Sequence, residues 1–533
     1  MDPEKVHARR WWVLFALCLS LVVIGMDNTI LNVALPTLVR DLHASSSELQ
    51  WIVDSYTIVY ASLLLTAGSL GDRRGRKGAL TLGLVIFAGG SLWAAFSGSA
   101  AVLIAARATM GIGGCLIMPS TLSILTNVFT EPRERAKAIG LWAGFSGIGI
   151  AAGPAMGGWL LSHFWWGSVF LINVPIAAVA ILLGHFTIPT SRDPSAPRPD
   201  LPGTGLSVLG LTVLLYGIIE APSAGWANGG VLAGFLGGVV VLTVFVLWER
   251  ASDHPMLDVR FFKNPRFSGA SFAITLVFFA MFGMIFLLTQ YLQFVLGFSP
   301  ARAGLGLIPL AVAMMIFAPL SAPLTARVGN KISVAGGLGI ALASLVLLTQ
   351  ATVHSGYLLV GIVLGVAGIG LATASAPATD SIMGSLPRAK AGVGSAVNDT
   401  TRQVGGAMGV AILGSVTAAS YHGGIARSSA LAGLTRAQRS SAHDSLGGAL
   451  GIARGAGVLG TKLAADARQA YVHAMSAAVW VGVGVALVGV LVALVFLPAR
   501  ARVEGELGDE QTTDLGGAQA PDLATSAEPS ARR

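Results

Sequence analysis

The amino-acid sequence predicts an all-α membrane protein that crosses the bilayer many times. Of its 533 residues, 54% are hydrophobic and only 11% are charged, and the mean hydropathy is +0.72. Soluble proteins carry about 25% charged residues, so this chain lacks the polar residues that the surface of a soluble fold of this length requires. Disordered chains are charged and poorly hydrophobic, which excludes extensive disorder. Apolar runs of spanning length and an internal duplication define the architecture further.

The predicted membrane helices follow from the length of the apolar runs. A spanning helix needs about 20 mostly apolar residues, and membrane helices tolerate the Gly and Pro that interrupt several of these runs. Windows of that length predict fourteen helices, over residues 11–36, 49–71, 79–97, 101–125, 137–161, 167–188, 203–220, 229–249, 266–290, 303–325, 332–353, 357–383, 391–419 and 472–497. The first run is too long for a signal peptide, so we expect it to remain as a membrane anchor.

The distribution of Lys and Arg predicts the orientation. With the N-terminus in the cytoplasm, most of the 34 basic residues fall in cytoplasmic segments, as the positive-inside rule requires. Six basic residues lie in one extracytoplasmic loop at about 420–471, and long loops count for little in this rule. Both termini are therefore expected to be cytoplasmic. Residues 500–533 are rich in small and acidic residues and predict a disordered tail.

An internal duplication divides the chain. Leu70, Arg73, Gly75 and Lys77 recur in order as Leu324, Arg327, Gly329 and Lys331, and the segment 135–138 recurs at 388–391 with almost the same offset. We expect a six-helix half at 1–189, a linker with two inserted helices at 190–262, and a second six-helix half at 263–499. Such parallel repeats place a binding site near the midplane between the halves and suit alternating access.

Several motifs resemble those of one transporter family. The loop Gly68–Lys77 reads G-S-L-G-D-R-R-G-R-K, Arg107 is followed by Gly111, Gly113 and Gly114, and Gly149–Gly158 reads G-I-A-A-G-P-A-M-G-G. The segments Met26–Pro36, Trp51–Tyr56 and Phe170–Pro175 match as well. Together they resemble the major facilitator superfamily, in its 14-span drug:proton antiporter branch of QacA and EmrB type. The second copy of the loop departs from the first, with Ala326 in place of Asp72 and Asn330 in place of Arg76.

The resemblance implies roles for two of these motifs. The loop is expected to form a conformational latch between the halves, built from Gly68, Asp72, Arg73, Gly75, Arg76 and Lys77. In it Asp72 would pair with Arg73 and lie at a neighbouring helix N-terminus. The alternative is an ordinary basic cytoplasmic loop. The antiporter motif, Gly149, Gly153, Pro154, Gly157 and Gly158, is expected to form a bendable hinge beside a central cavity, and the alternative is plain small-residue packing.

Ionisable residues within the predicted spans are the strongest candidates for function, because each costs about 2.5–3.5 kcal/mol at the centre of a helix unless it has a partner, water or a role. They are Asp27, Asp54, Arg107, Glu220, Asp380, Asp399 and Arg402. We expect Asp27 and Arg107 to couple transport to protons, and a static Asp27–Arg107 pair is the alternative. Asp54, Asp399 and Tyr56 are expected to bind substrate.

Alternatives remain for the other ionisable candidates. Asp54 could have an interfacial role near the outer end of its helix, and Asp399 could be neutralised by Arg402 on the same helix face. Asp380 and Glu220 lie near the ends of spans and favour a structural role.

These expectations combine into a proton-coupled multidrug exporter of amphipathic, cationic compounds in the bacterial plasma membrane. The partners would be drug-like small molecules, protons and lipid, with no nucleic acid, and the protein would work as a monomer. The alternatives are a dedicated exporter of an endogenous antibiotic or lipid-like metabolite, and a solute importer. The chain has no P-loop, HExxH or metal-binding spacing, and Cys18 and Cys115 lie in apolar runs, so no enzyme, cofactor, metal or disulfide is expected.

Overall fold

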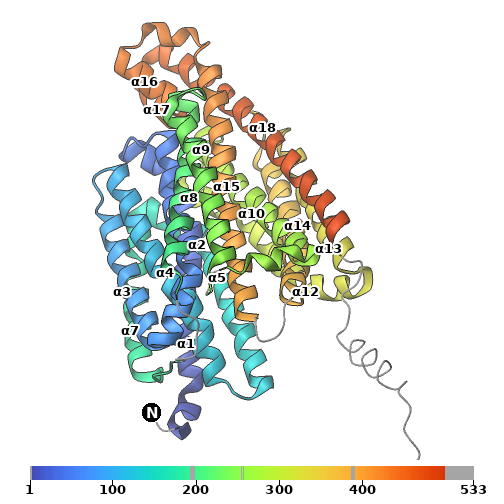
Figure 1. Cartoon of the computed structure of the whole chain (residues 1–533). Coiled ribbons are helices and arrows are strands. Elements are labelled where there is room, and N and C mark those ends of the chain that lie inside the picture. The colour runs from blue at the N-terminus through green and yellow to red at the C-terminus, as the bar shows by residue number, and fades with distance from the viewer. Residues whose placement is uncertain (1–2, 193–198, 254, 256, 386–390, 498–533) are drawn as a thin grey trace, which may run out of the picture.

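A bundle of long helices makes up the protein (Figure 1). The structure is a computed structural model and describes residues 3–192, 199–253, 255, 257–385 and 391–497. Its helices are α1 (Pro3–Asp41), α2 (Ser46–Arg74), α3 (Arg76–Ala95), α4 (Ala100–Val128), α5 (Pro132–His163), α6 (Ser168–Leu171), α7 (Asn173–Thr187), α8 (Leu201–Ala224), α9 (Gly229–Ala251), η1 (Val259–Lys263), α10 (Pro265–Gln290), η2 (Tyr291–Val295), α11 (Pro300–Leu305), α12 (Ile308–Val328), α13 (Asn330–Leu348), α14 (Tyr357–Met383), α15 (Ala391–Ile425), η4 (Ser429–Gly433), α16 (Arg436–Asp444), α17 (Leu446–Ala453) and α18 (Gly457–Phe496).

The helices agree with the predicted all-α fold and with its span count. Within the described residues, 13 helical segments are long and apolar enough to cross a membrane. The remaining predicted span, 137–161, corresponds to α5, which is a continuous helix of 32 residues. The predicted tail at 500–533 and the repeat residues 388–390 lie outside the described part of the chain.

Helices continue further into the predicted loop at 420–471 than the apolar pattern indicates. Helix α15 ends at Ile425, and α18 already starts at Gly457, well before the predicted boundary at 472. The extension of α18 carries Lys462, Asp466 and Arg468 on a segment that is polar but still favours helix. Between them lie η4, α16 and α17, which cap one end of the bundle at the top of Figure 1, hereafter the α16/α17 end.

The two sets of six spans repeat one packing scheme. Helix α1 packs on α5 and α7, and α4 packs on α2 and α3. In the second set α10 packs in the same way on α15 and α18, and α14 packs on α12 and α13. The equivalent order of contacts is what a duplicated six-helix unit requires.

The inserted helix α8 touches both sets. It packs against α2 and α15 as well as against its neighbour α9. Ser47 Oγ on α2 donates to Ile219 O at 3.3 Å, and Ser415 Oγ on α15 lies 2.7 Å from Ile218 O. Helix α8 therefore covers the seam where α2 and α15 meet, and a small apolar cluster around Ile58, Leu215 and Ala411 fills that seam.

Candidate functional site

Asp27 on α1 and Arg107 on α4 form a buried ion pair. Their side chains are 0% and 2% exposed, and Arg107 Nη1 donates to Asp27 Oδ2 at 2.5 Å. Asn173 Nδ2 on α7 donates to the other carboxylate oxygen, Oδ1, at 3.1 Å. Both oxygens of Asp27 are thus satisfied, as a carboxylate away from water requires. The structure brings together the two residues predicted to act in proton coupling. The ion pair that they form is common to this prediction and to its alternative, a static pair.

The rest of the Arg107 guanidinium is held by α2. Nε donates to Ile52 O at 3.2 Å, and the guanidinium carbon lies 4.5 Å from the centre of the Tyr56 ring, within range of a cation–π interaction. Tyr56 is fully buried and stacks on Tyr60, with ring centres 5.7 Å apart. Tyr56 was predicted to bind substrate, but in this conformation its ring is covered by Arg107 and Tyr60.

Glycines of α4 permit this close arrangement. A Cβ atom on Gly111 would lie 2.7 Å from Tyr56 O, and one on Gly114 would lie 2.9 Å from Tyr56 Oη. Small residues let helix backbones approach to such distances in membranes. The glycines that follow Arg107 in the sequence therefore set the position of α2 against α4.

Asn173 and Ser91 complete the network and were not singled out by residue in the sequence. Asn173 Nδ2 also donates to Ser91 Oγ on α3 at 3.2 Å, so five helices, α1, α2, α3, α4 and α7, share one buried polar cluster. The only sequence signal was that Asn173 lies inside a motif typical of the family. Ser91 gives no signal, because one hydroxyl in an apolar run is common and its partner is remote in sequence.

Asp54 on α2 is buried without a partner. Its side chain is 0% exposed, and neither carboxylate oxygen has a hydrogen-bond partner in the described part of the chain. Helices α15 and α8 pack against α2, and Asp54 is enclosed by protein in this conformation. The interfacial role stays an alternative. An anionic carboxylate in such surroundings needs a cation, a proton or water.

Asp399 and Arg402 on α15 are not joined by a direct ion pair in the described structure. Arg402 Nη2 instead donates to Thr379 Oγ1 on α14 at 3.0 Å, and its guanidinium carbon lies 5.2 Å from the centre of the Phe278 ring. Asp399 lies within electrostatic range of both Arg402 and Tyr60 on α2. Asp399 on α15 thus lies toward α2 of the first set, at the seam between these two helices.

The two acids near span ends have local partners. Asp380 Oδ2 accepts from Asn330 Nδ2 at 3.4 Å, and Glu220 Oε2 accepts from Ser223 Oγ at 3.3 Å. Asn330 also donates to Ser381 Oγ at 2.9 Å, so this substitute for Arg76 ties α13 to α14.

The antiporter motif of α5 packs directly against the helix that carries Asp27. Cβ atoms on Gly149 and Gly157 would lie 2.8 Å from Val22 O and 2.6 Å from Ile30 Cγ1 on α1. Between them, Thr29 Oγ1 lies 3.0 Å from Ile150 O. A bend of α5 would therefore displace residues of α1 that lie within about one helical turn of Asp27.

The opposite side of this motif meets the second set of helices. A Cβ atom on Gly158 would lie 2.5 Å from Ala301 Cα on α11, and Gly304 on α11 approaches the backbone of Pro154. The motif thus lies between the two halves and contributes to their contact near the α16/α17 end. Its predicted role as a hinge stays a prediction.

Within the loop at 68–77, Asp72 has a different partner from the one predicted. Its Oδ1 accepts from Arg76 Nε at 2.6 Å, not from Arg73. Gly75, at φ +129°, ends α2 and starts α3, and this turn brings Arg76 beside Asp72, whereas the neighbouring Arg73 projects from another side of the helix. Lys77 Nζ donates to His185 O at 2.7 Å, and Arg76 N donates to Ser191 O at 3.0 Å, at the start of the linker.

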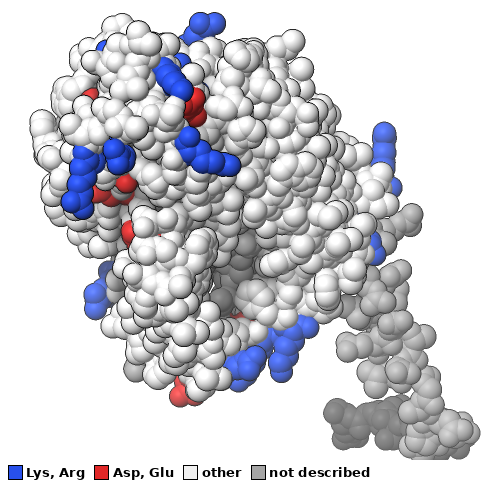
Figure 2. Space-filling model, turned by 90° about the horizontal axis from the view of Figure 1, so that it is seen from above, with Lys and Arg blue, Asp and Glu red and all other residues white. Residues whose placement is uncertain are grey.

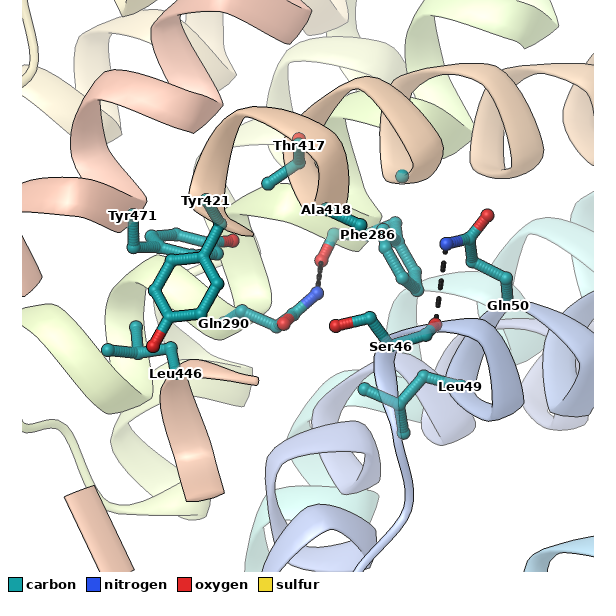
Figure 3. Close-up of a pocket in the computed structure, with 11 residues that line it drawn as sticks. Ser46, Leu49, Gln50, Phe286, Gln290, Thr417, Ala418, Tyr421, Leu446 and Tyr471 are labelled. Carbon is teal, nitrogen blue, oxygen red and sulfur yellow. Dashed lines mark hydrogen bonds between the residues drawn. The ribbon is translucent and has the colours of Figure 1, made fainter. Parts of the chain in front are cut away.

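The two halves meet around a small polar cavity near the α16/α17 end (Figure 3). The cavity has a volume of about 20 Å³, room for about one water molecule, and is lined by Gln50 on α2, Gln290 on α10 and Tyr421 on α15 among others. Nearby, Gln293 Nε2 donates to Val33 O on α1 at 2.8 Å. These amides were not predicted as functional from the sequence, although Gln within apolar spans is a signal of interhelical hydrogen bonding.

No group of three or more His, Cys, Asp or Glu side chains lies together in the described residues in a way that could hold a metal ion. Two helix sets with equivalent packing, a buried ion pair inside the first set and a glycine-rich helix at the contact between the sets are features typical of a membrane transporter. The sequence profile of the Major Facilitator Superfamily matches residues 17–410. The chain belongs to the major facilitator superfamily, and it is a transporter, not an enzyme, of the bacterial plasma membrane.

Relatives and solved structures agree with this assignment. The chain is 36% identical to the multidrug efflux pump LfrA of Mycolicibacterium smegmatis over 510 residues, which cover 94% of this chain and 97% of LfrA. It is 33% identical to the tetracenomycin C resistance and export protein of Streptomyces glaucescens, over 77% of this chain and 76% of that protein. A bacterial homologue of the lysosomal transporter Spinster, solved in an inward-facing conformation, shares the fold with a TM-score of 0.65, 19% identity and coverage of 92% and 98%.

Proposed function

We propose that the protein is a proton-coupled antiporter that exports amphipathic, cationic compounds from the cell. The observation that carries this proposal is the buried Asp27 carboxylate, held by Arg107 and Asn173 next to the glycine face of α5. A charge pair so placed is costly to keep and is typical of ion pathways in transporters. The similarity to LfrA, a multidrug efflux pump, supports export.

In the proposed cycle, Asp27 exchanges a proton for its bond to Arg107. Protonation would release the guanidinium, which would then bond more strongly to Ile52 O and the Tyr56 ring on α2. Because α1, α2, α4 and α7 all meet at this cluster, a change of charge there alters the packing of several helices together. Asp54, which has no partner, is the acid proposed to meet a cationic substrate.

In this proposal the proton gradient drives the exchange. Each proton that enters contributes about 1.4 kcal/mol per pH unit. A net charge moved inward adds about 2.3 kcal/mol per 100 mV of membrane potential. No cofactor is needed in this proposal.

The contacts between the halves support an inward-facing arrangement if the termini are cytoplasmic. The close approaches of Gly158 to Ala301 and of Gln293 to Val33 lie toward the α16/α17 end, which the distribution of Lys and Arg places outside. A site between the halves would then be reached from the cytoplasm, where an exporter collects its substrate.

Ethidium efflux from loaded cells tests the proposal. Wild type should export ethidium faster than an empty vector, and Asp27→Asn or a protonophore should reduce the rate to that of the vector. Glu220→Gln is the matched control, because it also converts an acid to an amide but alters a local contact on α8 only. Efflux by Asp27→Asn that equals wild type and still responds to the protonophore would refute the role of Asp27.

A dedicated exporter of one endogenous product is the second candidate, favoured by the similarity to the tetracenomycin C export protein. Both candidates require Asp27, so a substrate panel must separate them. Efflux of several unrelated cations supports the multidrug function, whereas efflux of one product and no ethidium supports the dedicated one.

A further inference from the structure

We propose that the α16/α17 end carries a separate binding site for an anionic, phosphate-bearing group. A cavity of about 590 Å³ opens there between the ends of α1, η2, α17 and α18. Its volume lies in the range of known small-ligand sites, about 300–1,000 Å³. It is far larger than the cavity between the halves and lies beyond the apolar core of the bundle.

Three arginines from separate elements line this cavity. Arg40 comes from the last turn of α1, Arg454 follows α17, and Arg468 belongs to the early part of α18. No Asp or Glu is among the lining residues. Arg40 lies within electrostatic range of Arg454, so two like charges converge at this cavity.

The guanidinium groups keep most of their hydrogen-bonding capacity. Arg454 makes no hydrogen bond or ion pair with the described part of the chain. Arg468 uses Nε to donate to Phe294 O at 3.1 Å, and this bond fixes the side chain along the cavity wall with its two Nη groups left over. Arg40 Nη2 donates to Thr37 Oγ1 at 3.0 Å, and its neighbour Asp41 is the one acid within electrostatic range.

This arrangement fits a phosphate better than a substrate cation. Guanidinium groups bind phosphate oxygens through paired, charge-assisted hydrogen bonds, and several around one cavity raise both affinity and selectivity for anions. Phe294, Phe298 and Leu450 form an apolar part of the wall, which suits an amphipathic ligand. The basic side chains seen at this end in Figure 2 stand on an otherwise mostly uncharged surface.

The unusual charge of the predicted loop at 420–471 has a function under this proposal. Six basic residues there oppose the usual distribution of charge across a membrane, and two of them, Arg454 and Arg468, line the cavity. The extension of α18 beyond its apolar part is what places Arg468 there. Since Arg40 belongs to the first half and the other two arginines to the second, a bound anion would bridge the halves.

The test is binding to the purified full-length protein in detergent, measured by native mass spectrometry and titration. The probes are phosphatidylglycerol, phosphatidylcholine with the same chains, and inorganic phosphate. We expect phosphatidylglycerol to bind about tenfold more tightly than phosphatidylcholine, and Arg454→Gln/Arg468→Gln to lose about that factor. Competition by inorganic phosphate at equal affinity would assign the site to free anions, and its failure to compete would assign it to the lipid headgroup.

Arg439→Gln is the matched control, because this arginine lies on α16 in the same loop and does not line the cavity. It should bind as wild type does. The proposal is overturned if wild type binds both lipids equally and binds no phosphate. It is also overturned if the control and the double variant lose the same factor in binding of phosphatidylglycerol. If the double variant does not fold, the exposed Arg454→Gln alone should weaken anion binding in the same direction. Binding does not require transport, so this outcome is independent of the proposed efflux.

Discussion

Two carboxylates on neighbouring helices have opposite surroundings in this protein. Asp27 is fully bonded by Arg107 and Asn173, whereas Asp54 is equally buried and has no hydrogen-bond partner in the described residues. Removing Arg107 is therefore costly for stability, because it leaves the Asp27 carboxylate buried without its compensating charge. Asp54 has no such partner to lose. The two carboxylates should therefore respond differently in stability when each is replaced by an amide.

For the Asp27–Arg107 pair, we expect Arg107→Gln to lower the free energy of unfolding by about 3–5 kcal/mol, because it leaves a buried carboxylate without its cation. Adding Asp27→Asn should recover most of the lost stability but not the efflux. Thermal unfolding in detergent and ethidium efflux measure the two effects. A double variant that regains transport with its stability would reduce the pair to a static support.

For Asp54, we expect Asp54→Asn to leave the unfolding temperature unchanged or higher, because an unpartnered buried carboxylate stabilises nothing. Efflux of cations should nevertheless fall, because the substrate loses its countercharge. Thermal unfolding and efflux by the same preparation check this. A large drop in stability together with normal efflux would show that Asp54 has a structural partner instead.

At the scale of the element, α5 connects the helix that carries Asp27 with the second half. One face of its motif packs on α1 beside Asp27, and Gly158 packs on α11 of the other half. Sequence spacing predicts that glycines four apart share a face, but it does not tell which helix they meet. Pro154 lies between the two contacts and removes a helix hydrogen bond where bending is easiest.

We expect Gly153→Ala to reduce both efflux and stability, by about 1–3 kcal/mol for the latter, because the added methyl group would lie 2.8 Å from Met26 O. Gly336→Ala on α13 is the matched control, since a Cβ atom there meets nothing within 4 Å. Unfolding temperatures and efflux rates of the two variants are compared. Equal, small effects would show that the α1–α5 contact can relax.

The loop between α2 and α3 gives a second prediction at this scale. The Asp72–Arg76 pair is partly exposed, so Asp72→Asn should change stability by no more than about 1 kcal/mol. If the loop is a latch, efflux should fall strongly all the same, and Arg74→Gln, the same loss of one charge in this loop, should retain it. Efflux rates normalised to the amount of protein in the membrane measure this, and parallel losses in both variants would favour the ordinary basic loop.

At the scale of the whole molecule, the two halves are similar in packing but not in chemistry. The buried ion pair, the unpartnered Asp54 and the Asp72 loop belong to the first half, and the corresponding loop of the second has Ala326 and Asn330. The second half instead supplies Asp399 near the seam and two of the three arginines that line the cavity at the α16/α17 end. Duplication kept the helix packing and allowed the polar residues to diverge.

The orientation of the whole bundle can be measured by cysteine labelling. Cys18 and Cys115 are buried at 1% and 2% exposure, so they should react little. Arg439→Cys on α16 should react with a membrane-impermeant maleimide in intact cells, and Lys263→Cys in η1 should react only after lysis. The reverse pattern would place the termini outside and would contradict the positive-inside prediction.

Some properties of this protein could be predicted from its sequence, because they depend on composition and on local spacing. Apolar runs of spanning length predict the membrane helices, and the motifs that resemble the family indicate Asp27, Arg107 and the α5 glycines as candidate functional residues. The prediction was wrong for the partner of Asp72, which pairs with Arg76 and not with Arg73, and α18 starts at Gly457, before the apolar segment predicted from residue 472.

Only the tertiary structure decided which polar groups meet. Asn173 and Ser91 reach Asp27 from helices far away in sequence, and Arg40, Arg454 and Arg468 converge from both ends of the chain. The physical reason is that the insertion of a helix into the bilayer depends on the hydrophobicity of that one segment. Which polar side chains meet depends instead on how the helices rotate and tilt against one another. Close packing of the whole bundle determines those rotations, and one segment does not encode them alone.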